Sequence, residues 1–573
     1  MRNVLLLALL VPIVALAATA PVAADERQPN VAMRPLVGSL DTIGGTTYDW
    51  CVNGPRLRLL VNSPTYGVHA AWMYSTTTSG TDFPDRNMRY NFYDITTHAW
   101  NWLDADYMQS GVNVYGKRAG HGNLDVDPSS GIAVVGAHVS VGSDIRPLVA
   151  RDAAPGAGIF EYADSLALGV CQWAPVSVNQ DGRINIFPIT AAYVLSYSNI
   201  PVGNWPNFTS PQGGFDPGPD FPTHNITASK VSSKVALTWS TNASAGGLQE
   251  AYVDFSTDGG ATWGGPTSVQ LPEAFGPDTV TSCHLTSLFP WYDAQDKFHI
   301  VANLMPMIND TGYIIPSQIW HYSPDNAPEW SRIHYASIDP ANFLYSPGMN
   351  ATIACRPTIG QDDDNNLFVA WEQFDTLNYE PSTSRARADI WASRSTDNGA
   401  TWGEGVKLTD AGTHSMRFPC VIDRAIEGNP DTMYVLYEDD SVAGFFVTTT
   451  GTPEGPATPN PIVVQKFSVE ELPTAVPAVA DQRPLAAVRL DADASPNPFG
   501  GRTLISYSVP RTGEVSLVIY DAAGRPVQTL ASGRREPGRY DATWDARSAA
   551  AGVYFYTLTS GASSITRKLI LAD

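Results

Sequence analysis

The sequence predicts an all-β protein: a β-propeller of six to seven four-stranded blades, with seven favoured, followed by a small β-sandwich. Three observations carry this prediction. The 573 residues include 47 Gly, 44 Pro, 15 Trp and 24 Tyr but only 16% charged residues, which is typical of turn-rich β-structure. A short apolar segment recurs every 50 to 68 residues. An eight-residue turn, Ser-Thr-Asp-x-Gly-Ala-Thr-Trp, occurs twice.

Residues 1–24 are expected to be a signal peptide. Arg2 is a short basic start, Leu5 to Leu16 form an apolar run, and the alanines that follow suit cleavage after Ala20 or Ala24. A lone membrane helix is the alternative, but the run is short for a span and contains Pro12. The mature chain is therefore expected to have no membrane span and to be secreted or held on an outer-membrane surface.

The recurring apolar segment indicates the second strand of each blade, here called strand B. Turn-forming residues precede several of the copies, as in Gln180-Asp181-Gly182. A period of this length leaves room for four strands in each unit, which is the signature of propeller blades over residues 36–470. The seven copies are Val68–Trp72, Val134–His138, Ile184–Pro188, Val235–Trp239, His299–Asn303, Leu367–Trp371 and Met433–Tyr437.

The sixth copy shows a whole blade. Strand A is expected at residues 355–359, B at 367–371, C at 389–394 and D at 406–408, with the eight-residue turn between C and D. In that turn the Asp accepts backbone N–H groups, the Gly supplies a positive φ and the Trp folds back as an apolar plug. The fourth copy repeats the pattern, with its strand C at 251–255.

These two turns resemble the Asp box of sialidases and other Asp-box (BNR) propellers. The resemblance implies a structural hairpin on the face away from the active site, so its residues are expected to have no part in chemistry. They are Ser256, Asp258, Gly260, Trp263, Ser395, Asp397, Gly399 and Trp402.

Propellers meet ligands at the connections into strand A and at the loops between strands B and C. This rule nominates Trp371 and Tyr437 as ligand contacts, together with a larger set of polar residues at the same ends of the strands. That set is Arg118, His121, Asp310, Tyr313, Arg356, Glu372, Asp375, Tyr379, Glu380, His414, Arg417, Glu438, Asp439 and Asp440.

The resemblance to sialidases implies three arginines around a sugar carboxylate, with a tyrosine–glutamate pair as nucleophile. Arg118, Arg356 and Arg417 are the available arginines, and the sequence shows no convincing tyrosine–glutamate pair. Another glycosidase would need two carboxylates about 5–10 Å apart. Glu372 with Glu438 or Asp439, from neighbouring blades, is the candidate catalytic pair.

Four cysteines precede the end of their strand B by similar distances, which places Cys171, Cys283, Cys355 and Cys420 on innermost strands. They are expected to be small buried apolar groups, with a Cys355–Cys420 bridge as the alternative. Cys51 makes the count odd. No metal or other cofactor is expected; Asp362 to Asn366 is read as a solvated hairpin, with a Ca²⁺ site as the alternative.

Residues 471–494 read as a Pro- and Ala-rich linker with no periodicity, and residues 495–573 alternate like the strands of a sandwich. This last segment resembles the Ig-like C-terminal domain shared by flagellar-hook-capping-type modules and type IX secretion sorting domains. Its ending, Arg567-Lys568-Leu569-Ile570-Leu571, is similar to that of the sorting signals. The resemblance implies the bacterial secretion machinery as a partner; a plain accessory module is the alternative.

The net charge of −22 and the pI near 4.7 argue against nucleic acid or an anionic membrane as partner. Two hypotheses for function remain. The first is an exported propeller that binds an extracellular glycan or protein. The second is a sialidase-like exo-glycosidase acting on extracellular glycans, so the sequence leaves open whether the protein is an enzyme.

Overall fold

The structure is a computed structural model of the whole chain. It describes residues 37–51, 58–80, 82–164, 169–190, 192, 194–215, 223–241, 251–276, 279–284, 288–308, 311–337, 343–428, 430–448, 452–474, 491–509, 513–535, 538–561 and 563–572. The expected signal peptide and most of the expected linker lie outside these residues. The chain divides into two compact units, residues 1–477 and 478–573.

The described part of the first unit forms seven antiparallel sheets, as the repeat predicted, and six of them are built from consecutive strands. The first three blades contain the strands β2 (Leu60–Ser63), β3 (Gly67–Tyr74), β4 (Asn87–Asp94), β5 (Ala99–Trp100) and β6 (Val112–Asn113); β7 (Ala119–Val126), β8 (Ala133–Val141), β9 (Asp144–Asp152) and β10 (Phe160–Asp164); and β11 (Cys171–Gln172), β12 (Val176–Val178), β13 (Ile184–Ile186), β14 (Ile189–Thr190), β15 (Leu195–Ile200) and β16 (Gln212–Phe215).

The strands of blades four to six are again consecutive in the chain. Their strands are β17 (His224–Ala228), β18 (Val235–Ser240), β19 (Ala251–Ser256) and β20 (Thr267–Val269); β21 (Val280–Cys283), β22 (Phe289–Tyr292), β23 (Phe298–Ile308), β24 (Thr311–Gly312), β25 (Ser317–Tyr322) and β26 (Trp330–Ala336); and β27 (Ala354–Gln361), β28 (Leu367–Glu380), β29 (Arg385–Ser395) and β30 (Val406–Lys407). Two short 3₁₀ turns, η1 (Tyr107–Gln109) and η4 (Val469–Glu471), complete this unit.

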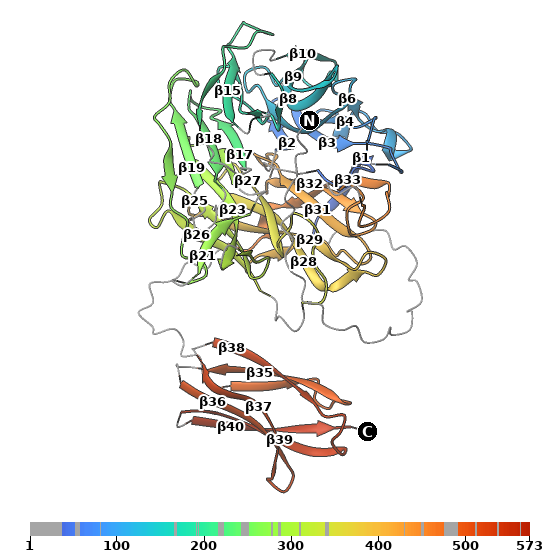
Figure 1. Cartoon of the computed structure of the whole chain (residues 1–573), viewed down its shortest axis with the longest axis vertical. Helices are drawn as coiled ribbons and strands as arrows, with labels where there is room; N and C mark the ends of the chain where they lie inside the picture. The colour runs from blue at the N-terminus through green and yellow to red at the C-terminus, as the bar shows by residue number, and fades with distance from the viewer. Residues whose placement is uncertain are drawn as a thin grey trace. The chain divides into compact units, whose positions relative to one another are not determined.

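Blade seven joins the two ends of the ring. Its strands β31 (Ser415–Val421), β32 (Thr432–Asp440) and β33 (Asn460–Ser468) come from the end of the unit, and its outermost strand is β1 (Ser39–Thr46) from the beginning. Ser39 pairs with Lys466 and Thr46 with Asn460. In Figure 1 the orange strands β32 and β33 therefore lie beside blue β1.

The innermost strands of successive blades pack against one another from β2 through β7, β12, β17, β22 and β27 to β31. The circle closes where β31 meets the segment leading into β2. The Leu59 amide donates to Sγ of Cys420 at 3.2 Å, and the Asn62 amide donates to Oδ1 of Asp423 at 2.7 Å. These bonds give every blade a neighbour on both sides.

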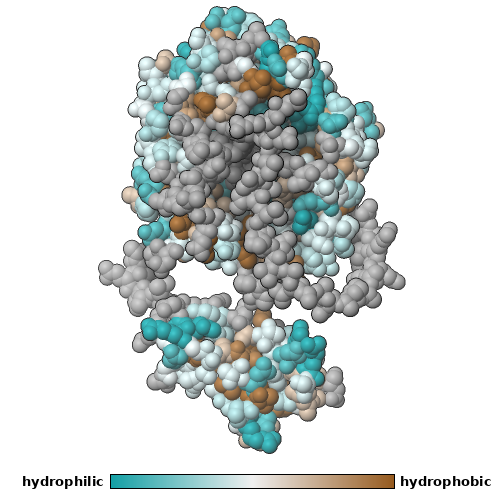
Figure 2. All heavy atoms as spheres, viewed as in Figure 1, coloured by the Kyte–Doolittle hydropathy of each residue, from teal (hydrophilic) through white to brown (hydrophobic). Residues whose placement is uncertain are grey.

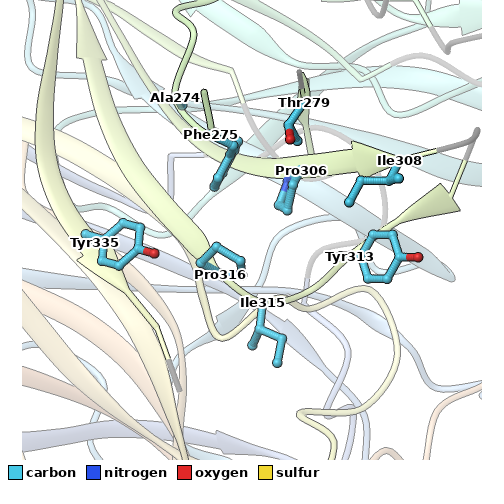
Figure 3. A pocket seen from close by; sticks show the side chains of 9 residues that line it. All are labelled: Ala274, Phe275, Thr279, Pro306, Ile308, Tyr313, Ile315, Pro316 and Tyr335. Atoms are coloured by element: carbon cyan, nitrogen blue, oxygen red, sulfur yellow. The ribbon is translucent and has the colours of Figure 1, made fainter. Parts of the chain in front are cut away.

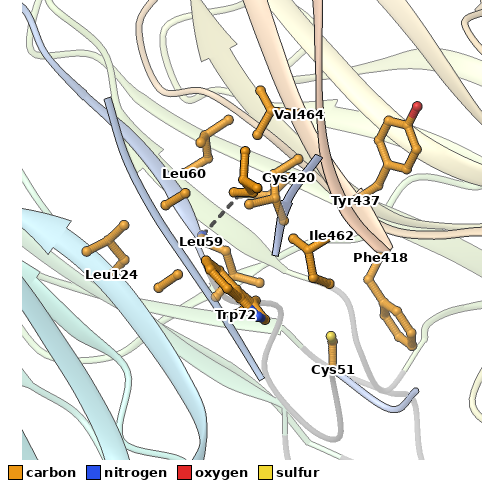
Figure 4. Close-up of a cluster of buried hydrophobic side chains, with 14 of the residues drawn as sticks. Cys51, Leu59, Leu60, Trp72, Leu124, Phe418, Cys420, Tyr437, Ile462 and Val464 are labelled. Atoms are coloured by element: carbon orange, nitrogen blue, oxygen red, sulfur yellow. Dashed lines mark hydrogen bonds between the residues drawn. The ribbon is translucent and has the colours of Figure 1, made fainter. Parts of the chain in front are cut away.

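The seven segments predicted as B strands lie in β3, β8, β13–β14, β18, β23, β28 and β32. Each is the second strand from the inside and is covered on both faces by neighbouring blades, which explains its uninterrupted apolar character. Trp72, Trp239 and Trp371, at the ends of three of the predicted segments, are at most 1% exposed. Figure 4 shows Trp72 packed among Leu59 and other side chains near Cys420.

All five cysteines are buried, and none of them forms a disulfide bond. The alternative of a Cys355–Cys420 bridge is therefore wrong. Sγ of Cys355 instead contacts Glu372, and Sγ of Cys420 accepts the Leu59 amide. The expectation of small buried groups on the inner strands agrees with this arrangement.

The turn between β29 and β30 has the geometry that its sequence suggests. Oδ1 of Asp397 accepts the Thr401 amide at 2.8 Å, and Oγ of Ser395 accepts the Gly399 amide at 2.9 Å. Gly399 has φ +78° and lies against the His321 ring of the preceding blade. The turn between β19 and β20 repeats these bonds, with Ser256 and Asp258 in the same positions.

The second unit is a sandwich of two sheets, as predicted. One sheet has the order β34 (Asp491–Ser495), β35 (Arg502–Val509), β38 (Gly538–Asp545); the other has the order β37 (Pro526–Arg535), β36 (Gly513–Asp521), β39 (Gly552–Ser560), β40 (Ser563–Leu571). Its core is drawn from residues 492–571 and includes the buried Trp544. Figure 2 shows polar and apolar side chains interspersed on the visible surfaces of both units. Among the described residues, no helix is long and apolar enough to cross a membrane.

Candidate functional site

One end of the propeller, here called the mouth, is formed where strands A begin and strands B end. In five blades a residue other than glycine has a positive φ at the same place on strand A. Such backbone costs about 1–3 kcal/mol per residue and collects at functional sites, often beside β-bulges. The register of the A–B pair shifts at this place in blades two, six and seven. The residues are His121 (+46°), Trp173 (+39°), Leu288 (+63°), Arg356 (+56°) and Phe418 (+57°).

The segment after β1 is clamped at the mouth between blades one and seven. The Thr47 amide donates to the carbonyl of Ser75 at 2.8 Å. On the other side, the Asp49 carboxylate accepts the amides of Phe446 at 2.5 Å and Val447 at 3.0 Å. These contacts hold Tyr48 in place.

Tyr48 belongs to a polar cluster on blades one and two. Nη1 of Arg86 donates to the Tyr48 hydroxyl oxygen at 3.2 Å, and Nη2 of Arg86 lies 3.1 Å from Nε2 of His138. The His121 ring centre lies 5.3 Å from that of His138 and 6.1 Å from that of Tyr48. Arg118 is the most exposed member and donates to the carbonyls of residues 82 and 83.

Burial sets the protonation states of this cluster. It lowers the pKa of His121 to about 3, with help from Arg86, and lowers the pKa of His138 well below 6.5. It also raises the pKa of Tyr48, more than Arg86 lowers it. At neutral pH both imidazoles are therefore uncharged and the phenol keeps its proton.

The hydrogen bonds also assign the imidazole tautomers. A guanidinium can only donate, so Nε2 of His138 accepts from Arg86 and Nδ1 carries the proton. His121 forms a hydrogen bond with the backbone of Cys51, whose carbonyl can only accept, while its Nδ1 has no partner among the described residues. Nδ1 of His121 therefore keeps a lone pair.

A second cluster lies between blades six and seven. Glu372 forms ion pairs with Arg356 and with Arg417, and the Phe418 amide donates to its Oε2 at 2.7 Å. Burial alone would raise the pKa of Glu372, but the two arginines outweigh it and hold that pKa at about 2. This carboxylate stays charged, and both of its oxygens are bound by Arg356, Arg417 and the Phe418 amide.

Three further acids share a buried site beside Arg417. Nδ2 of Asn460 donates to Glu438 at 2.9 Å and to Asp440 at 3.3 Å, and Sγ of Cys51 lies 3.5 Å from Glu438. Burial and the neighbouring Asp49 raise the pKa of Glu438 to about 8. Burial also raises the pKa of Asp49, to about 7, and burial together with Asp49 and Glu438 raises the pKa of Asp440, so this group carries protons at neutral pH.

The structure corrects several sequence-based expectations. Trp371 and Tyr437 are 0% exposed inside the blades, because strands β28 and β32 continue beyond them to Glu380 and Asp440. Arg356 and Arg417 are likewise buried and occupied by Glu372. None of these four side chains is available to a ligand, and the proposed Glu372–Glu438 pair has Arg417 beside both acids.

The other nominated residues lie along the rim of the mouth. Asp439 faces away from Glu438 and pairs with His414 at 2.7 Å. Tyr379 stacks on Tyr345 with ring centres 3.7 Å apart. Glu380 forms an ion pair with Arg387. Asp375 and Tyr313 are exposed, and Asp310 lies outside the described residues.

Sequence reasoning missed Tyr48, Asp49 and Arg86. Arg86 precedes β4 in a B–C loop, so the rule that nominated the other residues also applies to it. Tyr48 and Asp49 carry no comparable signal, because they follow β1 outside the repeating unit. His138 was recognised only as the end of a B strand.

The Asp362 loop is a closed hairpin. The Asn366 amide and side chain donate to the Asp362 carboxylate at 2.8 and 2.7 Å, and Nη2 of Arg394 lies 3.6 Å away. Within the described part of the chain, no group of three or more His, Cys, Asp or Glu side chains is placed to hold a metal ion.

Solved structures similar to the chain include two polysaccharide lyases and a sialidase. An ulvan lyase of polysaccharide lyase family PL25 has a TM-score of 0.42 and 14% identity, over 75% of this chain and 100% of that one. The lyase Uly1 has a TM-score of 0.41 and 9% identity, over 73% and 90%. The intramolecular trans-sialidase of Ruminococcus gnavus has a TM-score of 0.35 and 11% identity, over 76% and 98%. No curated protein sequence matches the chain.

The C-terminal unit gives the clearest family match. Residues 494–572 match the family described as the secretion system C-terminal sorting domain. This span covers the two sheets of the sandwich and the basic-then-apolar ending in β40. The C-terminal unit of this protein is therefore a type IX secretion sorting domain, which indicates export to the cell surface or the extracellular space.

Proposed function

We propose that the protein is an exported glycan-degrading enzyme that cleaves an acidic polysaccharide by elimination at the mouth of blades one and two. The observation that carries this proposal is the pair of hydrogen bonds from Arg86 to Tyr48 and His138. They hold a neutral phenol, a neutral imidazole and a guanidinium group in one buried cluster. The neutral His121 ring packs beside them, and the half-buried Arg118 lies at the edge. Elimination next to a sugar carboxylate needs this combination of base, acid and positive charge.

Each group has a role in the reaction. Nδ1 of His121 removes the proton from the carbon beside the carboxyl group, and that electron pair forms a carbon–carbon double bond. The bond from the next carbon to the glycosidic oxygen breaks, and this oxygen takes the Tyr48 proton. Arg118 at the entrance attracts the carboxylate. His121 then gives its proton to solvent and the Tyr48 phenolate regains one, so no water or oxidant is consumed.

The same geometry speaks against the sialidase-like alternative. That mechanism needs a tyrosine activated by a carboxylate and arginines free to bind the sugar. Here the Tyr48 oxygen accepts from Arg86, and Arg356 and Arg417 are paired with Glu372. Binding of an extracellular glycan without cleavage remains the second outcome that the experiment distinguishes.

The test incubates the purified full chain with a panel of polyuronates, including the glucuronate–rhamnose sulfate polymer bound to one of the similar lyases, and with neutral polysaccharides. Elimination creates an unsaturated sugar that absorbs ultraviolet light. His121→Asn, which keeps a residue that tolerates positive φ, and Tyr48→Phe are expected to lower kcat/KM by about 100-fold or more. Tyr115→Phe is the matched control, because this buried tyrosine donates to backbone carbonyls in blade two.

The outcomes separate the candidate functions. Unsaturated product from the wild type that is lost in both variants supports elimination. New reducing ends without unsaturation would assign a hydrolase instead. Binding without any cleavage would leave a glycan-binding propeller, and equal turnover in His121→Asn would remove this cluster from the chemistry.

A further inference from the structure

A hollow on blade five lies apart from the cluster of blades one and two. It encloses about 410 Å³, within the range of small-ligand sites of about 300–1,000 Å³. Its walls come from the connection into β21, the end of β23, the start of β25 and the end of β26. These are the loops that face the mouth, so the hollow opens at the end of the propeller that carries the cluster.

The lining suits the faces of sugar rings. Tyr313 is 44% exposed and Tyr335 is 48% exposed, and both line the hollow with Pro306 and Pro316. In Figure 3 the Pro316 ring lies between the two tyrosines, and Phe275 projects from the opposite wall. Flat aromatic rings with a hydroxyl at one end offer apolar stacking together with a polar contact.

The positive charge at the edge of the hollow favours an acidic chain over a neutral one. None of the residues lining the hollow is charged, so the portion of a ligand held there is uncharged. Arg332, which is exposed, lies 5.6 Å from the ring centre of Tyr335 and places a positive charge at the edge. A sugar chain with apolar ring faces and peripheral carboxylates matches both features.

One strand of blade five joins the hollow to the inner part of the ring. Strand β21 leads from Thr279, which lines the hollow, to His284, a span of about 16 Å at about 3.3 Å per residue. His284 is buried, and its pKa, which burial lowers to about 3, is also affected by Arg356 and Glu372 of the cluster between blades six and seven. Strand β21 and its continuation therefore carry one residue at the hollow and another near the cluster of Arg356 and Glu372.

We propose that the blade-five hollow is a distal subsite that stacks the ring faces of an acidic glycan whose other end occupies the mouth of blades one and two. The proposal rests on the function proposed above for the identity of the chain. The two sites belong to opposite parts of the ring, so only a long oligosaccharide reaches both. The subsite therefore contributes to the affinity for long chains and not to the chemical step.

The experiment measures affinity as a function of chain length by calorimetry on the full-length protein. The probes are short and long oligosaccharides of the same polyuronates and, in parallel, neutral oligosaccharides of matched length. Tyr313→Ala and Tyr335→Ala are each expected to weaken binding of the long acidic oligosaccharides by about three- to tenfold. Binding of the short ones should stay unchanged. Tyr66→Ala is the matched control, because Tyr66 is 39% exposed in the β2–β3 turn at the opposite end.

The readouts keep the two proposals apart. If His121→Asn abolishes cleavage but keeps the preference for long chains, both proposals stand. If the wild type binds long oligosaccharides through Tyr313 and Tyr335 without cleaving them, the subsite stands and the elimination fails. The subsite proposal is overturned if the tyrosine variants bind long chains as the wild type does, if no oligosaccharide binds, or if the variants instead abolish self-association in sedimentation experiments.

Discussion

Nε of Arg417 lies 3.4 Å from Oε2 of Glu372 inside the propeller, where neither side chain is more than 2% exposed. Arg356 binds the other oxygen of the same carboxylate. Three charges are thus buried with a net excess of one positive charge. These three side chains hold blades six and seven together and do not bind a substrate.

Removing the shared carboxylate should destabilise the propeller strongly. Glu372→Ala leaves two buried guanidinium groups without their partner, which is expected to lower the free energy of unfolding by about 3–5 kcal/mol. Urea denaturation followed by tryptophan fluorescence measures the change. Glu161→Gln, which breaks the exposed pair with Arg151, is the control and should cost less than about 1 kcal/mol. Equal effects of the two variants would contradict the buried cluster.

The acids beside Arg417 should make stability fall as pH rises. Glu438 keeps its proton up to about pH 8 in the folded chain, whereas its ordinary pKa is 4.5. Between these values the unfolded chain binds fewer protons than the folded one, so the free energy of unfolding decreases as pH rises from 5 to 8. Glu438→Gln should flatten this slope in denaturation curves taken across that range. A slope that is unchanged in this variant would show that Glu438 does not carry the effect.

Gly399 should tolerate no side chain. It has φ +78°, and a Cβ there would lie 2.2 Å from Cε1 of the buried His321. Gly399→Ala should therefore lower the melting temperature more than Gly142→Ala does. Gly142 has φ +63° with nothing within 4 Å of the added Cβ, so it reports backbone strain alone, about 1–2 kcal/mol. Similar melting temperatures for the two variants would mean that the His321 contact is unimportant.

Removing residues 495–573 should leave the thermal unfolding of the propeller nearly unchanged. The core of the sandwich is drawn from residues 492–571, and the seven sheets of the propeller are built from earlier residues. In its host, the truncated protein should accumulate in the periplasm, because the sorting domain is missing. Cell fractionation measures this.

A milder change tests the same domain. Replacing Arg567 and Lys568 with Ala should impair export less than the truncation, because β40 and the sandwich would still form. Normal export of the truncated protein would show that the C-terminal unit is a plain accessory module.

The blade pattern could be predicted from the sequence because burial on both faces leaves an uninterrupted apolar strand in every unit. Val68–Trp72 and Leu367–Trp371 are such strands, and turn residues separate them from their neighbours. Ring closure by β1 could not be predicted in this way. Its partner β33 lies more than four hundred residues away, and neither strand has a sequence feature that identifies the other as its partner.

The candidate site was predicted less well than the fold. The position of Arg118 and His121 along the blade correctly predicted that they lie at the mouth. It could not predict which arginines form ion pairs with a carboxylate. Arg356 and Arg417 are occupied because both reach Glu372 of β28, a pairing that depends on the bulges at strand A. Tyr48 lies outside the repeat and becomes part of the cluster only when the ring closes.

The position of β1 also sets an order of events during synthesis and export. Ser39 pairs with Lys466, so the first strand leaves the ribosome with its sheet edge unpaired until the last strand of the propeller appears. At about 5–20 residues per second, this delay is about 20–80 s. Throughout it, an open edge is exposed to wrong partners. The ring, and with it the site built around Tyr48, can therefore close only after the last blade has been translated.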